Sequence, residues 1–250
     1  MIPLTWINEA TKRIYPHIKK TPLTYDAENE LYLKWENHQI TGSFKARGAF
    51  NKVLSLSNWE KARGLVTASA GNHGLGVAQA ARTTGTDVLV FVSEHAVAIK
   101  VEAIQNQGAK INKVPGGYEE AEEAAIKYAN EHGAIWISPY NDGQIIAGQG
   151  TIALEILNQI PKLKHASWLV PVGGGGLISG IGVCLKADPA ASWTKSVQKI
   201  GISRLIGIQS QASPFMYTYF YTGSQENLVE LSSLADGLSG PVENGSVTFP

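Results

Sequence analysis

Residues 167–180 read Ser-Trp-Leu-Val-Pro-Val-Gly-Gly-Gly-Gly-Leu-Ile-Ser-Gly, an apolar run that passes without a break into four glycines. The apolar run predicts a buried strand, and the glycines predict a tight turn into the helix that follows. A strand that leads directly into a helix is typical of parallel sheets, because neighbouring parallel strands need a crossover connection. This stretch therefore predicts an α/β fold.

The same alternation of short apolar runs and helical patterns extends along the chain. Strands are expected at residues 31–36, 64–69, 87–93, 110–115, 134–139, 167–172 and 204–210. Helices are expected at residues 5–14, 46–55, 72–84, 96–107, 118–132, 144–159 and 175–187. Because the strands are apolar almost throughout, helices should cover both faces of each sheet. We expect open parallel sheets in three-layer domains.

The composition limits the classes of function. The 250 residues include 21 basic and 21 acidic side chains, and this balance argues against a nucleic-acid partner. No apolar run reaches the roughly 18 residues of a membrane helix, and the N-terminus lacks a secretory signal. A single cysteine, Cys184, excludes an internal disulfide and a cysteine metal site. We expect a cytoplasmic protein without a membrane segment.

The four glycines at residues 173–176 are candidates for a phosphate site. After a buried strand they can turn backbone N–H groups towards an anion at the start of the next helix. A dinucleotide site is the alternative, but the G-x-G-x-x-G pattern fails, because Ile178 or Ser179 stands where the third glycine is needed. The loop is therefore predicted to bind a phosphate group that does not belong to a dinucleotide.

A second junction of strand and helix reads Ser69-Ala70-Gly71-Asn72-His73-Gly74. Its backbone N–H groups, with the side chains of Ser69 and Asn72, could hold a carboxylate. Ordinary helix capping explains the same residues equally well.

Lys45, in Thr41-Gly42-Ser43-Phe44-Lys45-Ala46-Arg47-Gly48, is a candidate nucleophile. A lysine at the start of a helix is usually solvated. Phe44 and the small flanking residues could remove water from this one, and desolvation lowers a lysine pKa and makes the amine reactive towards aldehydes.

A phosphate loop, a carboxylate site and a candidate Schiff-base lysine are the parts that a pyridoxal-phosphate enzyme needs. In this order they resemble the fold-type II family of pyridoxal-phosphate enzymes that holds threonine/serine ammonia-lyases (dehydratases) and serine racemase. The stretches that carry the resemblance are residues 13–23, 31–37, 41–50, 69–74, 146–151, 171–176 and 234–237.

The resemblance implies a role for each matching residue. Lys45 is similar to the lysine that forms the Schiff base with pyridoxal 5'-phosphate and removes the substrate α-proton, and Phe44 to its neighbour beside the ring. Asn72 is similar to the residue that meets the phenolic oxygen of the cofactor. The amino-acid carboxylate would be held by the loop of Ser69, Ala70, Gly71, Asn72 and His73. The phosphate would be held by Gly173, Gly174, Gly175, Gly176 and the N–H of Leu177.

The activity that the resemblance implies is α,β-elimination of L-threonine or L-serine to a 2-oxo acid and ammonia. Racemases of the family carry a serine where Ala70 stands here, so we expect elimination rather than racemisation. We expect no metal, because Gln209, Ser213 and Phe215 occupy the segment where cation-binding members place carboxylates. The alternatives are β-replacement or threonine-synthase-like chemistry with the same cofactor, and a shortened, catalytically impaired paralogue that binds pyridoxal phosphate.

The family layout predicts two domains. The larger, cofactor-binding domain would comprise residues 1–63 and 142–250, and the smaller, substrate-closing domain residues 64–141. Family members continue past the position of Pro250, so the C-terminal part of the larger domain, with its contact to the pyridine nitrogen, is expected to be missing. Family members usually pair, so we expect a homodimer or a higher oligomer.

Overall fold

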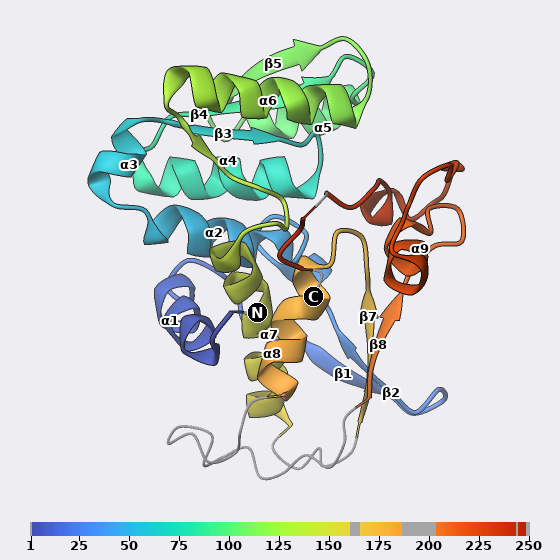
Figure 1. Ribbon diagram of the computed structural model, residues 1–250. Coiled ribbons are helices and arrows are strands. Elements are labelled where there is room, and N and C mark those ends of the chain that lie inside the picture. Colours follow the sequence, from blue (N-terminus) through green and yellow to red (C-terminus); the bar gives the residue numbers. More distant parts are fainter. Residues whose placement is uncertain (1, 161–165, 187–203, 244, 249–250) are drawn as a thin grey trace.

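Figure 1 presents the computed structural model of the chain, which describes residues 2–160, 166–186, 204–243 and 245–248. The helices are α1 (Leu4–Ile14), α2 (Lys45–Ser55), α3 (Asn58–Ala62), α4 (Asn72–Thr84), α5 (Ala98–Gln105), α6 (Tyr118–His132), α7 (Gly143–Gln159), α8 (Gly176–Leu185) and α9 (Phe215–Thr222), with short 3-10 helices η1 (Glu36–His38) and η2 (Asp236–Leu238). The strands are β1 (Leu23–Asp26), β2 (Leu31–Lys34), β3 (Leu65–Ala68), β4 (Val88–Ser93), β5 (Lys110–Val114), β6 (Ile135–Trp136), β7 (Ser167–Pro171) and β8 (Arg204–Ile208).

A four-stranded parallel sheet lies between two helical layers, with α6 on one face and α4 on the other (Figure 1). Its strand order is β5-β4-β3-β6, and Leu65 of β3 stands opposite Val88 of β4. Successive residues of β3 face opposite layers, as a strand requires. Leu65 packs in the core that includes α4, whereas Val66 packs against the alanines of α6. This is the covered parallel sheet that the apolar strands predict.

Helices α4, α2, α7 and α8 pack in succession from this sheet towards β7 (Figure 1). Glycines allow α8 to cross α7, and α7 to cross α2, at short distance. A Cβ on Gly180 of α8 would lie only 2.5 Å from the carbonyl oxygen of Ile146 in α7, and one on Gly148 of α7 only 2.5 Å from that of Arg47 in α2. Because these positions carry no side chain, the backbones approach closely. The first turn of α2, where Lys45 stands, is thus tied to α7.

Two smaller sheets complete the fold. β7 pairs in parallel with β8, with Ser167 opposite Arg204, and β1 pairs antiparallel with β2. A second core, formed by α1, α7 and α8, includes Trp168 and Val170 from the inner face of β7. Within the described ranges, none of the helices combines the length and apolar character that crossing a bilayer would require.

The structure confirms the α/β class and differs from the sequence prediction in local detail. Residues 31–34 do not extend a parallel sheet, because Asp26 accepts hydrogen bonds from the N–H groups of Glu28 and Asn29 and turns the chain back as a hairpin. The strand expected at 134–139 is only β6, and the helix expected at 175–187 ends at Leu185 within the described residues. Strand β1 and helices α3 and α9 were not predicted. The division into two domains stays a prediction, although the four-stranded sheet uses only residues 65–136.

Candidate active site

The candidate lysine and the four glycines line one pocket. The glycines follow the carboxyl end of β7, where ligands of open α/β sheets bind, and Lys45 begins α2. The lining residues are Phe44, Lys45, Pro139, Tyr140, Gln149, Pro171, Gly173, Gly174, Gly175, Gly176, Leu177, Gly237 and Leu238. Seven of the residues expected to bind a cofactor therefore share this pocket: Phe44, Lys45, Leu177 and the four glycines.

Lys45 lies among groups that do not compensate its charge. Its Nζ donates a hydrogen bond to the carbonyl oxygen of Pro139, 2.9 Å away, and lies 5.6 Å from the ring centroid of Phe44. Within the described part of the chain no carboxylate forms an ion pair with it. Desolvation therefore lowers the pKa of Lys45 to about 8. A large share of the amine is neutral near that pH and can attack an aldehyde.

The tetraglycine loop, residues 173–176, requires its glycines. Gly175 is the N-cap of α8 and has φ +86°, a left-handed backbone conformation that residues other than glycine rarely adopt. A Cβ on Gly174 would overlap the ring of Tyr140. The loop opens the 10-residue helix α8, whose first N–H groups have no carbonyl one turn earlier. Backbone N–H groups in this arrangement bind phosphate.

Tyr140 lines the pocket, and hydrogen bonds join it, its neighbour Asn141 and Gly174 to residues near the C-terminal end of the chain. Tyr140 Oη accepts a hydrogen bond from the N–H of Glu243 at 2.8 Å, and Asn141 Nδ2 donates to Glu243 Oε2 at 2.7 Å. Thr248 Oγ1 donates to the carbonyl oxygen of Gly174 at 2.7 Å. The cavity that remains measures about 40 Å³, space for about three water molecules at most.

The loop at residues 69–73 is built as a helix start. Ser69 Oγ accepts a hydrogen bond from the N–H of Gly71 at 3.1 Å, and α4 begins at the exposed Asn72. The buried His73 places Nε2 3.1 Å from the carbonyl oxygen of Ile137. Desolvation, and next the nearby charge of Lys45, lower the pKa of His73 to about 3, so its imidazole is neutral. Ala70 packs on the main core.

The residues of this loop do not line the Lys45 pocket, but the segment after β6 connects the two. The carbonyl oxygen of Ile137 also accepts a hydrogen bond from Thr67 Oγ1 at 2.8 Å, and two residues later Pro139 accepts the bond from Lys45. In addition, a Cβ on Gly76 of α4 would lie 3.4 Å from the carbonyl group of Lys45. The expected carboxylate loop and the lysine thus stand on neighbouring elements.

Buried polar atoms around Lys45 offer hydrogen bonds that other described residues do not use. Five buried side-chain polar atoms lack a hydrogen-bond partner within the described chain. Four of them are Thr41 Oγ1, Ser43 Oγ, His73 Nδ1 and Gln149 Nε2. Thr41 and Ser43 lie shortly before Lys45 in the sequence, and Gln149 lines the same pocket as Lys45. The charge of Lys45 contributes to the lowered pKa of His73. Buried polar groups normally pair, so this concentration fits a site that receives a polar ligand.

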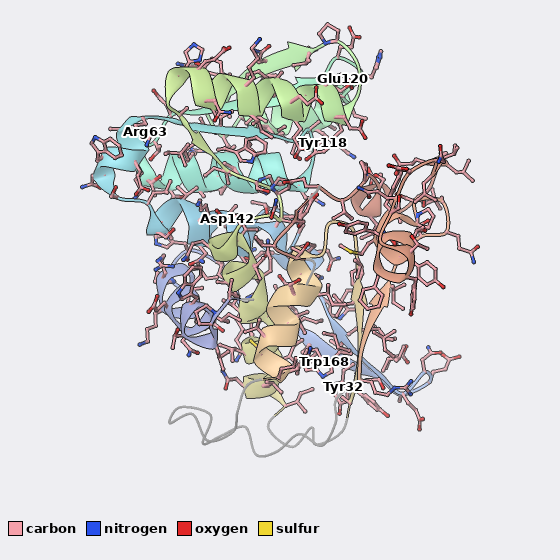
Figure 2. The ribbon with its side chains drawn as sticks, viewed as in Figure 1. Tyr32, Arg63, Tyr118, Glu120, Asp142 and Trp168 are labelled. Carbon is pink, nitrogen blue, oxygen red and sulfur yellow. The ribbon has the colours of Figure 1, made fainter. Side chains whose placement is uncertain are left out.

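A buried cluster of four charges fixes the first turn of α2. Arg47 bonds Glu36 at 2.8 Å and Glu155 at 3.0 Å, and Lys34 bonds Glu155 at 2.5 Å. Arg47 is fully buried, and Glu155 is 1% exposed. At the start of α7, Asp142 (Figure 2) accepts from the N–H groups of Gln144 and Ile145 and pairs with Lys52 of α2. Lys45 is therefore carried by a helix that is anchored at both ends.

Six of the pocket residues had no role assigned from the sequence alone: Pro139, Tyr140, Gln149, Pro171, Gly237 and Leu238. A signal existed for Pro139 and Tyr140, because Pro139 ends a predicted strand and Tyr140 follows it, at the carboxyl edge of the sheet. Gln149 and Gly237 lie in stretches that carry the family resemblance without an assigned role. Gln149 reaches the pocket through the packing of α7, and Gly237 and Leu238 reach it through the packing of η2 beside the tetraglycine loop.

The chain is similar to proteins of known family and structure. Residues 14–250 match the family described as pyridoxal-phosphate dependent enzyme. An L-threonine ammonia-lyase of Thermotoga maritima is 39% identical over the whole chain, which spans 60% of that relative's length. A catabolic L-threonine dehydratase of Staphylococcus aureus is 39% identical over 95% of the chain and 67% of its own length. The structure of maize serine racemase superimposes with a TM-score of 0.84 at 30% identity, covering 98% of this chain and 72% of the racemase.

Proposed function

The chain belongs to the family of pyridoxal-phosphate-dependent enzymes, and from this premise we propose that it eliminates the β-hydroxyl of L-threonine or L-serine to give a 2-oxo acid and ammonia. The observation that carries the proposal is the pocket in which a desolvated Lys45 faces the tetraglycine loop. The 39% identity to an L-threonine ammonia-lyase supports the choice of reaction.

The residues of the pocket suit the cofactor. When bound, pyridoxal phosphate supplies an aldehyde that reacts with amines and a ring that withdraws electrons from the substrate α-carbon. In our proposal Lys45 holds the aldehyde end and later takes the α-proton, since its lowered pKa lets the neutral amine act as a base. Phe44 would pack beside the ring, and the N–H groups of the tetraglycine loop and Leu177 would hold the phosphate.

The substrate would be oriented by residues 69–73. In this role the N–H groups at the start of α4 bind the substrate carboxylate, and Asn72, exposed at the first position of that helix, is available to the cofactor's phenolic oxygen. His73 stays neutral and keeps the loop in place through Ile137. Ala70 has no hydroxyl to return a proton, which favours elimination over racemisation.

Tyr140 lines the pocket beside the tetraglycine loop. Tyr140 is the side chain that lies on Gly174, and its hydroxyl is held by the N–H of Glu243. We therefore propose that Tyr140, held by Glu243, supports the shape of the phosphate loop.

The test is the release of 2-oxobutanoate from L-threonine by the wild-type chain and by Lys45→Ala, each with added pyridoxal phosphate. We expect release by the wild type and a rate at least about 1,000-fold lower for Lys45→Ala, because this residue would act both as nucleophile and as base. Lys127→Ala is the control, since Lys127 is exposed on α6 and lies outside the pocket. Equal rates for wild type and Lys45→Ala would refute the assignment.

Two alternatives differ in their products. β-Replacement or threonine-synthase-like chemistry would give a new amino acid from O-acetylserine or O-phosphohomoserine. A catalytically impaired paralogue would show the visible absorbance of bound cofactor without 2-oxo acid. Product analysis over these substrates and threonine separates the three.

We also propose that the protein works as a homodimer or a higher oligomer and in the cytoplasm. Both proposals rest on the family to which the chain belongs. Sedimentation velocity of the purified chain and fractionation of the source cells test them.

A further inference from the structure

The side chain of Gln149 in α7 lies against Gly48 where α7 crosses α2. A Cβ on Gly48 would overlap the Gln149 side chain, and one on Gly148 would overlap the backbone of α2. Because both positions are glycine, the helices approach closely enough for Gln149 to lie over the first turn of α2. Gly48 is three residues after Lys45 and therefore lies near the same face of the helix.

The hydrogen bond to Gly48 determines the orientation of the amide. Gln149 Oε1 accepts from the N–H of Gly48 at 3.1 Å. Since an N–H can bond only to the oxygen of the amide, the nitrogen is the other end. Gln149 is 1% exposed, and its Nε2 finds no acceptor among the residues that the structure describes. A buried N–H group without a partner is costly, so an acceptor is expected beside it.

The missing acceptor is expected in the pocket that Gln149 lines. Gln149 lines it together with Lys45 and the tetraglycine loop. We propose that Gln149 is a cofactor-binding residue whose Nε2 donates a hydrogen bond to an oxygen of pyridoxal phosphate, an inference that rests on the proposed function. The same amide holds the N–H of Gly48, so one side chain joins the bound cofactor to the turn of α2 that carries Lys45.

A second glutamine provides a matched control. Gln209 Oε1 accepts from the N–H of Tyr217 at 2.8 Å, in the first turn of α9, and its Nε2 is likewise buried without a partner in the described part of the chain. Gln209 lines a different groove, between β8 and α9. The two amides thus make the same local bond, and only Gln149 lies in the Lys45 pocket.

The experiment compares Gln149→Glu with Gln209→Glu. Each variant keeps the oxygen that accepts the backbone N–H and loses the N–H donors. Cofactor-free protein is titrated with pyridoxal phosphate, and the dissociation constant is read from the visible absorbance of the bound cofactor. We expect roughly 10- to 100-fold weaker binding for Gln149→Glu, the range for loss of a hydrogen bond to a charged group. Gln209→Glu should bind within about twofold of wild type.

Two further measurements test whether the variants are folded and which oxygen of the cofactor Gln149 binds. If Gln149→Glu does not fold, Gln149→Met with Gln209→Met as its control replaces it, and thermal unfolding of the cofactor-free chains shows which variants are folded. Titration with pyridoxal, which lacks the phosphate, locates the oxygen. A loss shared by pyridoxal places the oxygen on the ring, and a loss seen only with pyridoxal phosphate places it on the phosphate.

Wild-type affinity in a folded Gln149 variant overturns the inference. A wild-type chain that does not bind pyridoxal phosphate overturns both this inference and the proposed function. A wild-type chain that binds the cofactor but releases no 2-oxobutanoate overturns the proposed function alone, and the comparison of the glutamine variants still decides the role of Gln149.

Discussion

The amine of Lys45 donates to the backbone carbonyl oxygen of Pro139 at 2.9 Å. A carbonyl is a neutral acceptor, so this bond orients the amine without neutralising it. The structure thus couples the first residue of α2 to the segment that follows β6. It also leaves desolvation as the cause of the lowered pKa, about 8, of Lys45.

The lowered pKa of Lys45 predicts how its replacement changes stability with pH. Below pH 8 Lys45 is protonated in both the folded and the unfolded chain. The free energy of unfolding is then lowered by the full cost of burying the charged amine. Between pH 8 and the ordinary lysine pKa of 10.5 only the unfolded chain keeps the proton, so stability rises with pH. Lys45→Met should therefore stabilise the cofactor-free chain at pH 7 and lose most of that advantage at pH 10. Urea unfolding at both values measures it, and an unchanged difference contradicts the prediction.

The buried charge cluster predicts a large loss of stability when one member is neutralised. Burial alone would raise the pKa of Glu155, but the bonds to Arg47 and Lys34 outweigh it, and the pKa is lowered. Glu155→Gln leaves the buried Arg47 and the partly buried Lys34 without this carboxylate, so we expect a decrease of about 3 kcal/mol in the free energy of unfolding. Glu131→Gln, at an exposed surface pair, should change it by less than about 0.5 kcal/mol. Equal effects of the two variants in urea unfolding would contradict this account.

Ala70 predicts a change of reaction outcome. In the proposed function a serine at this position supplies a hydroxyl that can return a proton to the substrate α-carbon. Ala70→Ser should therefore form D-serine from L-serine at a rate at least about tenfold above wild type, below the roughly 100- to 10,000-fold that a well-positioned acid or base contributes. Chiral chromatography measures the product, and Ala70→Gly, which has no hydroxyl, is the control. D-serine at the wild-type level in Ala70→Ser would show that position 70 does not decide the outcome.

The fold was predictable wherever apolar runs alternate with helical patterns. Strands β3, β4, β5, β7 and β8 lie within a residue or two of their expected bounds. Helix α9 has aromatic residues on all sides and therefore no helical period, and β1 is too short and polar to stand out. Helix α3 did carry a signal, the capping box of Ser57 and Glu60.

The pocket was predictable only in part, because sequence motifs identify groups that bind but not the groups that are brought to them. Lys45 and the tetraglycine loop are recognisable by their local pattern. Tyr140 and Gln149 enter through tertiary packing: one because Gly174 leaves room for its ring, the other because Gly48 leaves room for its amide. At both positions the informative residue is a glycine in a different element, which a reading along the chain cannot connect.

Gly174 and Tyr140 predict a steric coupling at the phosphate loop. A methyl group on Gly174 would overlap the Tyr140 ring, whereas a Cβ on Gly173 would lie 3.6 Å from its nearest neighbour, an ordinary contact. Gly174→Ala should therefore distort the loop and weaken pyridoxal phosphate binding about tenfold or more, the effect of roughly 1.4 kcal/mol of strain. Gly173→Ala should have a smaller effect. Titration of the cofactor-free chain by visible absorbance compares the two.

The double variant Gly174→Ala with Tyr140→Ala identifies the cause of that loss. If the clash with the ring is responsible, removing the ring restores most of the affinity, so the two substitutions are not additive. Tyr140→Phe is the control that keeps the ring and removes only the hydroxyl bonded by Glu243, and it should not rescue Gly174→Ala. Additive losses in the double variant would show that Gly174 is needed for its own backbone rather than for the space it leaves to Tyr140.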